Sequence, residues 1–175
     1  MELRFAPLDL ASLDELKTEV LCLVLFADEL PPRGASGLVD WRLCGRLSRL
    51  LDSAQFSAAF DEALLLPPPE QRLAAERLLL VGAGARAALD LAAVTTLVNA
   101  LMARVLKLRV RTAAIALPHA SLPWLSAAQA IDLFLDASQS GAERLDEVVL
   151  VDTHEAQRAM EPRIESARRR ALAAL

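Results

Sequence analysis

The stretch from residue 73 to residue 106 limits the possible folds more than any other part of this chain. It contains residues 77–81, which read Arg-Leu-Leu-Leu-Val and are followed by a turn with Gly82 and Gly84. A continuous apolar run of this length, ended by a glycine turn, is typical of a strand that is buried on both faces of a sheet. We therefore expect a central strand here.

A long helix is expected to follow this strand. Asp90 is a residue type that favours the N-cap position, and residues 91–107 contain only Arg104 as a charge before the final Lys107. A helix that is apolar nearly all round is expected to be covered on most of its sides. A buried strand followed by a covered helix is the centre of a layered α/β domain.

Five further segments carry the pattern of strands, because each is an apolar or alternating run that ends at a proline or a charged residue. They are residues 1–8, 20–27, 62–67, 110–117 and 147–152. Pro7 indicates that the first of them lies near an edge of the sheet, where a missing backbone N–H is tolerated.

Helices are expected between most of these strands. Capping-box patterns at residues 12–15 and 126–129 predict two helix starts. Apolar residues at spacings of three and four predict one continuous helix from residue 38. Its buried stripe would consist of Leu38, Trp41, Cys44, Leu47 and Leu51. The final helix, residues 153–175, contains Pro162, which predicts a kink or a break.

The alternation of strands and helices predicts a single α/β domain over residues 1–175. The expected architecture is a three-layer α/β/α sandwich around a six-stranded, mostly parallel sheet. Segments 62–67 and 77–81 have no full helix between them, which indicates that the sheet is mixed. The pattern leaves the strand order open.

Composition narrows the classes of function. A net charge of -4 and a pI of about 5.2 argue against nucleic acid as a partner, since its binding depends on neutralising phosphates. No apolar run reaches the length of about 18 residues that a membrane span needs, and no signal-peptide pattern opens the chain. These features predict a cytoplasmic protein, in which Cys22 and Cys44 would be reduced and buried.

The order of three motifs resembles a known family. Residues 32–40 read Pro-Arg-Gly-Ala-Ser-Gly-Leu-Val-Asp, residues 62–67 read Glu-Ala-Leu-Leu-Leu-Pro, and residues 77–84 read Arg-Leu-Leu-Leu-Val-Gly-Ala-Gly. This series resembles the N-terminal domain of leucyl (cytosol) aminopeptidases over essentially the whole chain. The resemblance implies a macro-domain-like fold and a part of the enzyme that is not catalytic.

The catalytic part of that family has no counterpart in this sequence. In the family, a separate C-terminal domain carries two metal ions, a catalytic lysine and an NTDAEGR-like segment, and this sequence has no such segment. The resemblance therefore implies a domain without peptidase activity, catalytic residues, metal or cofactor. Two origins stay open, a stand-alone accessory domain and a fragment of a longer protein.

Side chains that could perform chemistry are few and scattered. His119 and His154 have no ligand partner at helical spacing, and His119 is expected to be a solvated loop residue. Cys44 would need a base and an activating field to act as a nucleophile, so a core thiol is expected instead. Thr153 as an N-cap explains the polar run that opens the last helix.

Two glycine loops could hold a phosphate. Residues 34–37 directly precede the helix expected from residue 38, whose free N–H groups suit an anion. Residues 82–87 fit the permissive G-x-G-x-x-A pattern, but a tight turn is favoured because the next helix starts only near residue 90. The candidate ligand-binding residues are Gly34, Ser36, Gly37, Gly82 and Gly84. Analogy with macro domains suggests an ADP-ribose-like nucleotide as the ligand.

The last helix bears on partners. Its basic side chains are Arg158, Arg163, Arg168, Arg169 and Arg170, and its apolar side chains include Met160, Ile164, Ala167, Leu172 and Leu175. The simplest interpretation packs the apolar side on the sheet and leaves the arginines in water. The alternative is a docking surface for a second copy or for another protein.

Two functions from different classes remain. The first is a non-catalytic accessory or regulatory domain that acts through protein–protein interaction. The alternative is a small-ligand module that binds an ADP-ribose-like nucleotide at the strand-end glycine loops. An enzyme is not expected, because no nucleophile–base pair or pair of carboxylates stands out in the sequence.

Overall fold

The fold is built on one six-stranded sheet. A computed structural model describes residues 1–67 and 72–173. The strands are β1 (Glu2–Pro7), β2 (Val20–Leu25), β3 (Ala63–Leu66), β4 (Leu78–Gly82), β5 (Thr112–Ile115) and β6 (Glu147–Asp152). Their order is β1-β6-β5-β2-β4-β3, with β3 antiparallel to β4 and every other neighbouring pair parallel. The predicted mixed sheet is confirmed, and β1 lies at an edge as expected.

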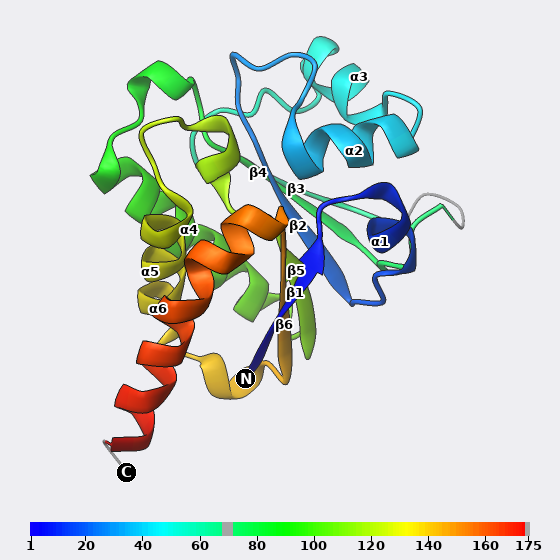
Figure 1. The fold of residues 1–175 in the computed structure, drawn as a ribbon. Helices are drawn as coiled ribbons and strands as arrows, with labels where there is room; N and C mark the ends of the chain where they lie inside the picture. Colours follow the sequence, from blue (N-terminus) through cyan, green and yellow to red (C-terminus); the bar gives the residue numbers. More distant parts are fainter. Residues whose placement is uncertain (68–71, 174–175) are drawn as a thin grey trace.

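Helices cover both faces of this sheet (Figure 1). On one face lie α1 (Leu10–Glu15), α2 (Gly34–Arg42) and α3 (Arg46–Asp52). On the other lie α4 (Leu91–Lys107), α5 (Ala127–Ser138) and α6 (His154–Ala173). The predicted α/β/α sandwich is confirmed. Within the described residues, no helix combines the length and apolar character that a membrane span requires.

Strand β2 separates two hydrophobic cores. All six of its residues are buried, which is what its unbroken apolar sequence predicts. Because successive side chains of a strand point to opposite faces, Val20, Cys22 and Val24 enter the core beneath α4, α5 and α6. Leu21, Leu23 and Leu25 enter the core beneath α1, α2 and α3. Burial raises the pKa of the Cys22 thiol, so Cys22 is an unreactive core residue.

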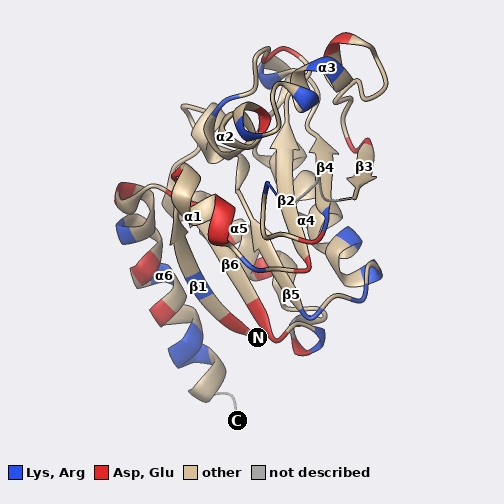
Figure 2. Ribbon diagram, turned by 90° about the vertical axis from the view of Figure 1, so that its right-hand side faces the viewer, with Lys and Arg blue, Asp and Glu red and all other residues tan. Residues whose placement is uncertain are grey.

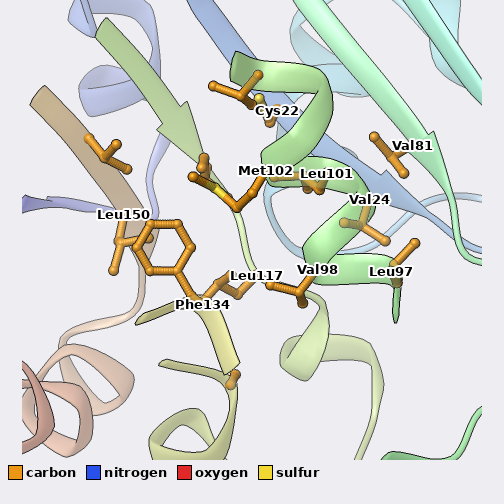
Figure 3. Close-up of a cluster of buried hydrophobic side chains, with 14 of the residues drawn as sticks. Cys22, Val24, Val81, Leu97, Val98, Leu101, Met102, Leu117, Phe134 and Leu150 are labelled. Atoms are coloured by element: carbon orange, nitrogen blue, oxygen red, sulfur yellow. The ribbon is translucent and has the colours of Figure 1, made fainter. Parts of the chain in front are cut away.

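Helix α4 is covered on one side only, which corrects the expectation for residues 91–107. Its buried side chains include Leu97, Val98, Leu101 and Met102, which gather against β2 and α5 in Figure 3. The opposite side exposes Ala92, Thr96, Asn99 and Ala103. These side chains carry no charge, but they are small or polar and can face water at little cost. The predicted N-cap is present, since Asp90 accepts a hydrogen bond from the Ala93 N–H at 2.8 Å.

The helix expected from residue 38 is in fact two helices joined at a sharp corner. Cys44 and Gly45 adopt left-handed backbone conformations, with φ of 55° and 77°. The buried carboxylate of Asp40 then caps α3, because it accepts hydrogen bonds from the N–H groups of Leu47 (2.7 Å) and Ser48 (3.0 Å).

This corner makes the predicted stripe wrong at two positions. Trp41 is 67% exposed, and Cys44 is also exposed instead of buried. The left-handed residues rotate the chain between the helices, so a single helical register does not hold across them. Leu43, which the stripe omits, is buried in its place.

Two further helix boundaries differ from expectation. Helix α1 starts at Leu10, because Asp9 rather than Ser12 is its N-cap and accepts the Ser12 N–H at 2.7 Å. Helix α6 continues unbroken past Pro162, which lies on its exposed side. The predicted capping box of Ser126 with Gln129 is present at the start of α5.

The segments that follow the neighbouring strands β2 and β5 run to opposite faces of the sheet. The chain passes from β2 to α2 on one face and from β5 to α5 on the other. In open α/β sheets, a ligand is usually held outside the carboxyl ends of strands at such a reversal. The topology therefore indicates a candidate site at the carboxyl ends of β2 and β5.

Replacement of Asp40 by alanine should destabilise the domain by about 2 kcal/mol, because two N–H groups at the buried corner lose their acceptor. The exposed cap of α4 provides a comparison, and Asp90→Ala should cost about 1 kcal/mol. Urea denaturation of both variants measures the difference. Equal losses would show that Asp40 acts as an ordinary surface cap.

Candidate functional site

The carboxyl ends of β2 and β5 enclose only a small cavity. Its volume is about 20 Å³, and it is lined by the end of β2, the first turn of α2 and the 3-10 turn η2 (Pro118–Ser121) that follows β5. A cavity of this size holds roughly one water molecule. Small-molecule pockets usually measure about 300 Å³ or more.

One buried carboxylate ties three strand-end loops together beside this cavity. Glu29, which follows β2, is 6% exposed. Its Oε1 lies 3.2 Å from Nη1 of Arg86 in the loop after β4, and its Oε2 accepts a hydrogen bond from the Ser121 hydroxyl at 3.0 Å. Arg86 also binds Asp28. We term Asp28, Glu29, Arg86 and Ser121 the Glu29 clamp.

The clamp depends on charge as well as geometry. The backbone N–H of Arg86 donates to Asp28 at 3.0 Å, and this bond, with the nearby guanidinium, holds the pKa of Asp28 below its usual value. A lowered pKa means that the ionised carboxylate stabilises the folded loop above the pKa of the unfolded chain. That contribution is lost as the pH falls through the lower folded value.

The side chain of His119 is largely buried, which corrects the expectation of a solvated loop histidine. Its side chain is 9% exposed, and its Nε2 lies 3.2 Å from Oδ2 of Asp152 at the end of β6. Its Nδ1 is buried without a hydrogen-bond partner in the described part of the chain. The pair joins the loop after β5 to β6. Within residues 1–67 and 72–173, no group of three or more His, Cys, Asp or Glu side chains lies close enough together to hold a metal ion.

Residues 34–37 form the first turn of α2, so the helix starts four residues earlier than predicted. The Ser36 hydroxyl donates to the Val24 carbonyl at 2.9 Å and ties α2 to β2. Gly37 has no room for a side chain, because a Cβ there would lie 2.5 Å from the Pro32 carbonyl oxygen. In the described structure, the N–H groups of Gly34, Ala35 and Ser36 make no hydrogen bond, as is usual for a first helical turn.

Gly82 and Gly84 form a turn whose N–H groups are all occupied. The N–H of Gly82 donates to Glu62, that of Ala83 to Leu25 and that of Gly84 to Ala58, each at 2.8 Å. Gly84 has a positive φ of 73°, and Gly82 lies directly against the backbone of residues 58 and 59. Gly34 and Ser36 line the small cavity, whereas Gly82 and Gly84 do not.

The sequence profile of the cytosol aminopeptidase family, N-terminal domain, matches residues 23–147, which is more than half of the chain. The chain belongs to this family. A search of the curated proteins finds no match.

Solved structures resemble this aminopeptidase-family domain in fold. A mutant of tomato leucine aminopeptidase superposes with a TM-score of 0.57 and 19% identity, covering 91% of this chain and 35% of its own. A macrodomain from Trypanosoma brucei has a TM-score of 0.70 and 14% identity, covering 93% of this chain and 65% of its own. A further structure of the Trypanosoma brucei macrodomain is a complex with ADP.

A bacterial macrodomain is similar as well. The macrodomain of Mycobacterium tuberculosis DarG has a TM-score of 0.64 and 12% identity, covering 85% of this chain and 96% of its own. At these identities, the likeness shows a shared fold and nothing about ligands. The aminopeptidase-family domain spans 35% of the tomato enzyme, so the activity of that enzyme does not carry over.

Sequence reasoning missed the Glu29 clamp. Glu29 and Arg86 are separated by 57 positions, and the bond from Ser121 to Glu29 spans 92. All three are residue types that normally face water, so nothing local marks them. The one available signal was that each follows the end of a predicted strand, and the ends of parallel strands meet at one edge.

The two glycines of the turn after β4 should differ in their response to alanine. Gly84→Ala should cost about 1–2 kcal/mol, since its Cβ fits and only the left-handed backbone is strained. Gly82→Ala should cost more, because its Cβ would lie 2.2 Å from the Ala59 carbonyl oxygen and the backbone must move. Denaturant unfolding of each variant tests the order, and a smaller loss at Gly82 would contradict the close approach.

Proposed function

We propose that this chain is a non-catalytic accessory domain of the cytosol aminopeptidase family that acts through contacts with another protein or a second copy. The observation that carries the proposal is the outer part of α6. The last buried side chain of this helix is Ile164, yet the helix continues to Ala173. Figure 1 shows this end extending past the sheet.

The exposed end of α6 has the composition of a docking surface. Leu172 is 72% exposed, and the exposed basic residues Arg168, Arg169 and Arg170 directly precede it in the helix. Figure 2 shows blue (basic) and red (acidic) residues alternating along the ribbon of α6 before this end. Isolated helical turns are only marginally stable in water, so an end whose large apolar side chain, Leu172, stays exposed gains from a partner.

The family match supports the absence of peptidase chemistry. The matched residues, 23–147, correspond to an N-terminal domain, and the catalytic features implied by the resemblance lie outside such a domain. We further propose that residues 1–175 act as one domain in the cytoplasm, where an exposed Cys44 would remain reduced.

The second candidate is a nucleotide module, because the fold is that of macrodomains and the first turn of α2 has free N–H groups. Two observations weigh against it. The cavity beside those N–H groups is about 20 Å³, and the Glu29 clamp ties the adjoining loops together. Gly82 and Gly84 have no free N–H group to offer a phosphate.

Titration with ADP-ribose, ADP and NAD separates these functions. Ligand at about 100 times its Kd would add about 2.7 kcal/mol to stability, which raises the melting temperature of a chain this size by several degrees. We expect no rise at millimolar ligand, as measured by thermal shift and calorimetry. The control is Ala120→Glu, because the Cβ of Ala120 lies 3.7 Å from the Cβ position of Gly34 and the new carboxylate would repel an anion. A rise that this variant abolishes would favour the nucleotide module.

Association through α6 should depend on its exposed end. Leu172→Asp should weaken binding to a partner or a second copy by about tenfold or more, because it places a charge in the apolar part of the contact. Leu91→Asp, which changes another exposed leucine on α4, is the matched control. Sedimentation velocity measures self-association, and quantitative pull-down measures partners. A role for α6 would be refuted if the wild type is monomeric and both variants recover the same proteins in the pull-down.

A further inference from the structure

A second surface lies on the outer side of α2. A groove of about 840 Å³ runs between α2, the loop before it and the segment that begins at Arg72. Its lining residues include Pro31, Leu38 and Trp41, together with Arg33, Arg42 and Arg72. The volume is within the range of binding pockets, in contrast with the small cavity at the strand ends.

Two large apolar side chains in and beside the groove are exposed. Trp41 is 67% exposed, and Leu30, next to the lining residue Pro31, is 57% exposed. The corner at Cys44 and Gly45 turns α3 away from Trp41 and leaves the indole ring on the surface. Exposed apolar patches rimmed by polar groups mark interaction sites, and Trp and Arg are the residue types that most often dominate binding energy.

The cationic side of the groove is held in place before anything binds. Arg42 and Arg72 each donate a hydrogen bond to the backbone carbonyl of the other at 3.3 Å. Arg72 also donates to the Cys44 sulfur at 2.8 Å, and Arg42 pairs with Asp14 at 2.7 Å. Side chains that are already ordered lose less entropy on binding.

The described lining residues of the groove carry net positive charge, although the chain as a whole carries -4. The carboxylate among the described lining residues is Asp40, which is buried and occupied in capping α3. Arg33 makes no ion pair within the described residues. Complementary charge would therefore come from the occupant.

We propose that this groove binds an acidic peptide segment of a partner protein, with an apolar side chain on Trp41 and carboxylates on Arg33 and Arg72. The inference rests on the proposed function, since it names the chemistry of a partner, but it uses a surface separate from α6. A guanidinium pairs with a carboxylate through two parallel hydrogen bonds, which favours an acidic segment over a neutral one.

Other occupants fit this surface less well. A nucleic acid strand would need a longer positive track than three arginines, one of which is already paired with Asp14. The exposed end of α6 in a second copy carries three arginines, which the groove would repel. Both occupants are outcomes that the experiment below would detect.

Cys44 supplies a direct reporter of occupancy. Its thiol lines the groove and is exposed, whereas Cys22 is completely buried. A thiol reagent should therefore modify Cys44 in the folded protein and spare Cys22. An occupant of the groove should slow this modification, and a ligand bound at α6 or at the strand ends should not.

The experiment selects a random twelve-residue peptide display library on the full chain, with counter-selection on the Trp41→Ala, Arg33→Glu double variant. Both positions are exposed, so the variant should fold normally, as circular dichroism can verify. The matched control variant is Trp124→Ala, Arg109→Glu, which removes an exposed tryptophan and reverses an exposed arginine outside the groove. Selected peptides are synthesised, and their affinity is measured by fluorescence anisotropy.

We expect the selected peptides to combine Asp or Glu with Leu, Ile or Phe. They should bind the wild type and the control variant equally, lose about tenfold or more in affinity on the double variant, weaken with salt and protect Cys44. Basic or neutral consensus sequences, equal binding to the double variant or no selection at all would overturn the proposal. Preferential binding of single-stranded DNA, or dimerisation lost in the double variant, would also do so.

The two proposals fail independently. A result against the groove leaves the α6 test untouched, because neither Trp41 nor Arg33 is on that helix. If the Leu172→Asp test shows no association that depends on α6, and the selected peptides still bind the groove, the protein contacts of this domain lie at α2 instead.

Discussion

The burial of β2 on both faces is the constraint on which the rest of this structure depends. Its six apolar residues supply side chains to both cores, so helices must cover the sheet on each side. The same strand lies beside β5 at the point where the connections reverse direction. One run of eight apolar residues therefore determines the layer architecture and also the place where a ligand crevice could form.

Side chains of the Glu29 clamp fill the crevice at the strand ends, whereas the corner between α2 and α3 leaves an apolar surface exposed beside it. The Glu29 clamp joins the loops after β2, β4 and β5, which leaves little volume between them. On the outer side of α2, the left-handed corner at Cys44 and Gly45 leaves Trp41 without a neighbour in the core. In this domain, which shares the macrodomain fold, the larger opening is the groove beside α2 and not the cavity at the ends of β2 and β5, where the topology suggests a site.

Much of the fold could be predicted from local patterns. Strands β2 and β4 are continuous apolar runs, as expected for strands buried on both faces of the sheet. Asp90 and Ser126 mark helix starts because their side chains accept hydrogen bonds from backbone N–H groups only three residues further on. The corner between α2 and α3 could not be predicted in this way. It depends on a non-glycine residue, Cys44, in a left-handed conformation, and apolar spacing continues across it as if one helix ran through.

The candidate site was harder to predict than the fold, for a different physical reason. Its polar contacts join residues far apart in the sequence, and a buried carboxylate such as Glu29 is stable only because Arg86 and Ser121 meet it in space. His119 shows the same limit, since its burial follows from Asp152 on another strand. The glycine loops could be recognised in the sequence. Gly37 and Gly82, however, are explained by the close approach of a neighbouring backbone, and this explanation needs no ligand.

The two edges of the sheet have a consequence for how this domain can assemble. Strand β3 has only four residues and is followed by Pro67, while β1 ends at Pro7 and its Leu3 carbonyl accepts a hydrogen bond from Arg168 of α6 at 3.1 Å. Short edges with proline and a covering side chain offer a poor template for an added strand. Sheet extension between copies, the route by which exposed strands aggregate, is therefore disfavoured, which is why the contacts that we propose use helix side chains instead of strand edges.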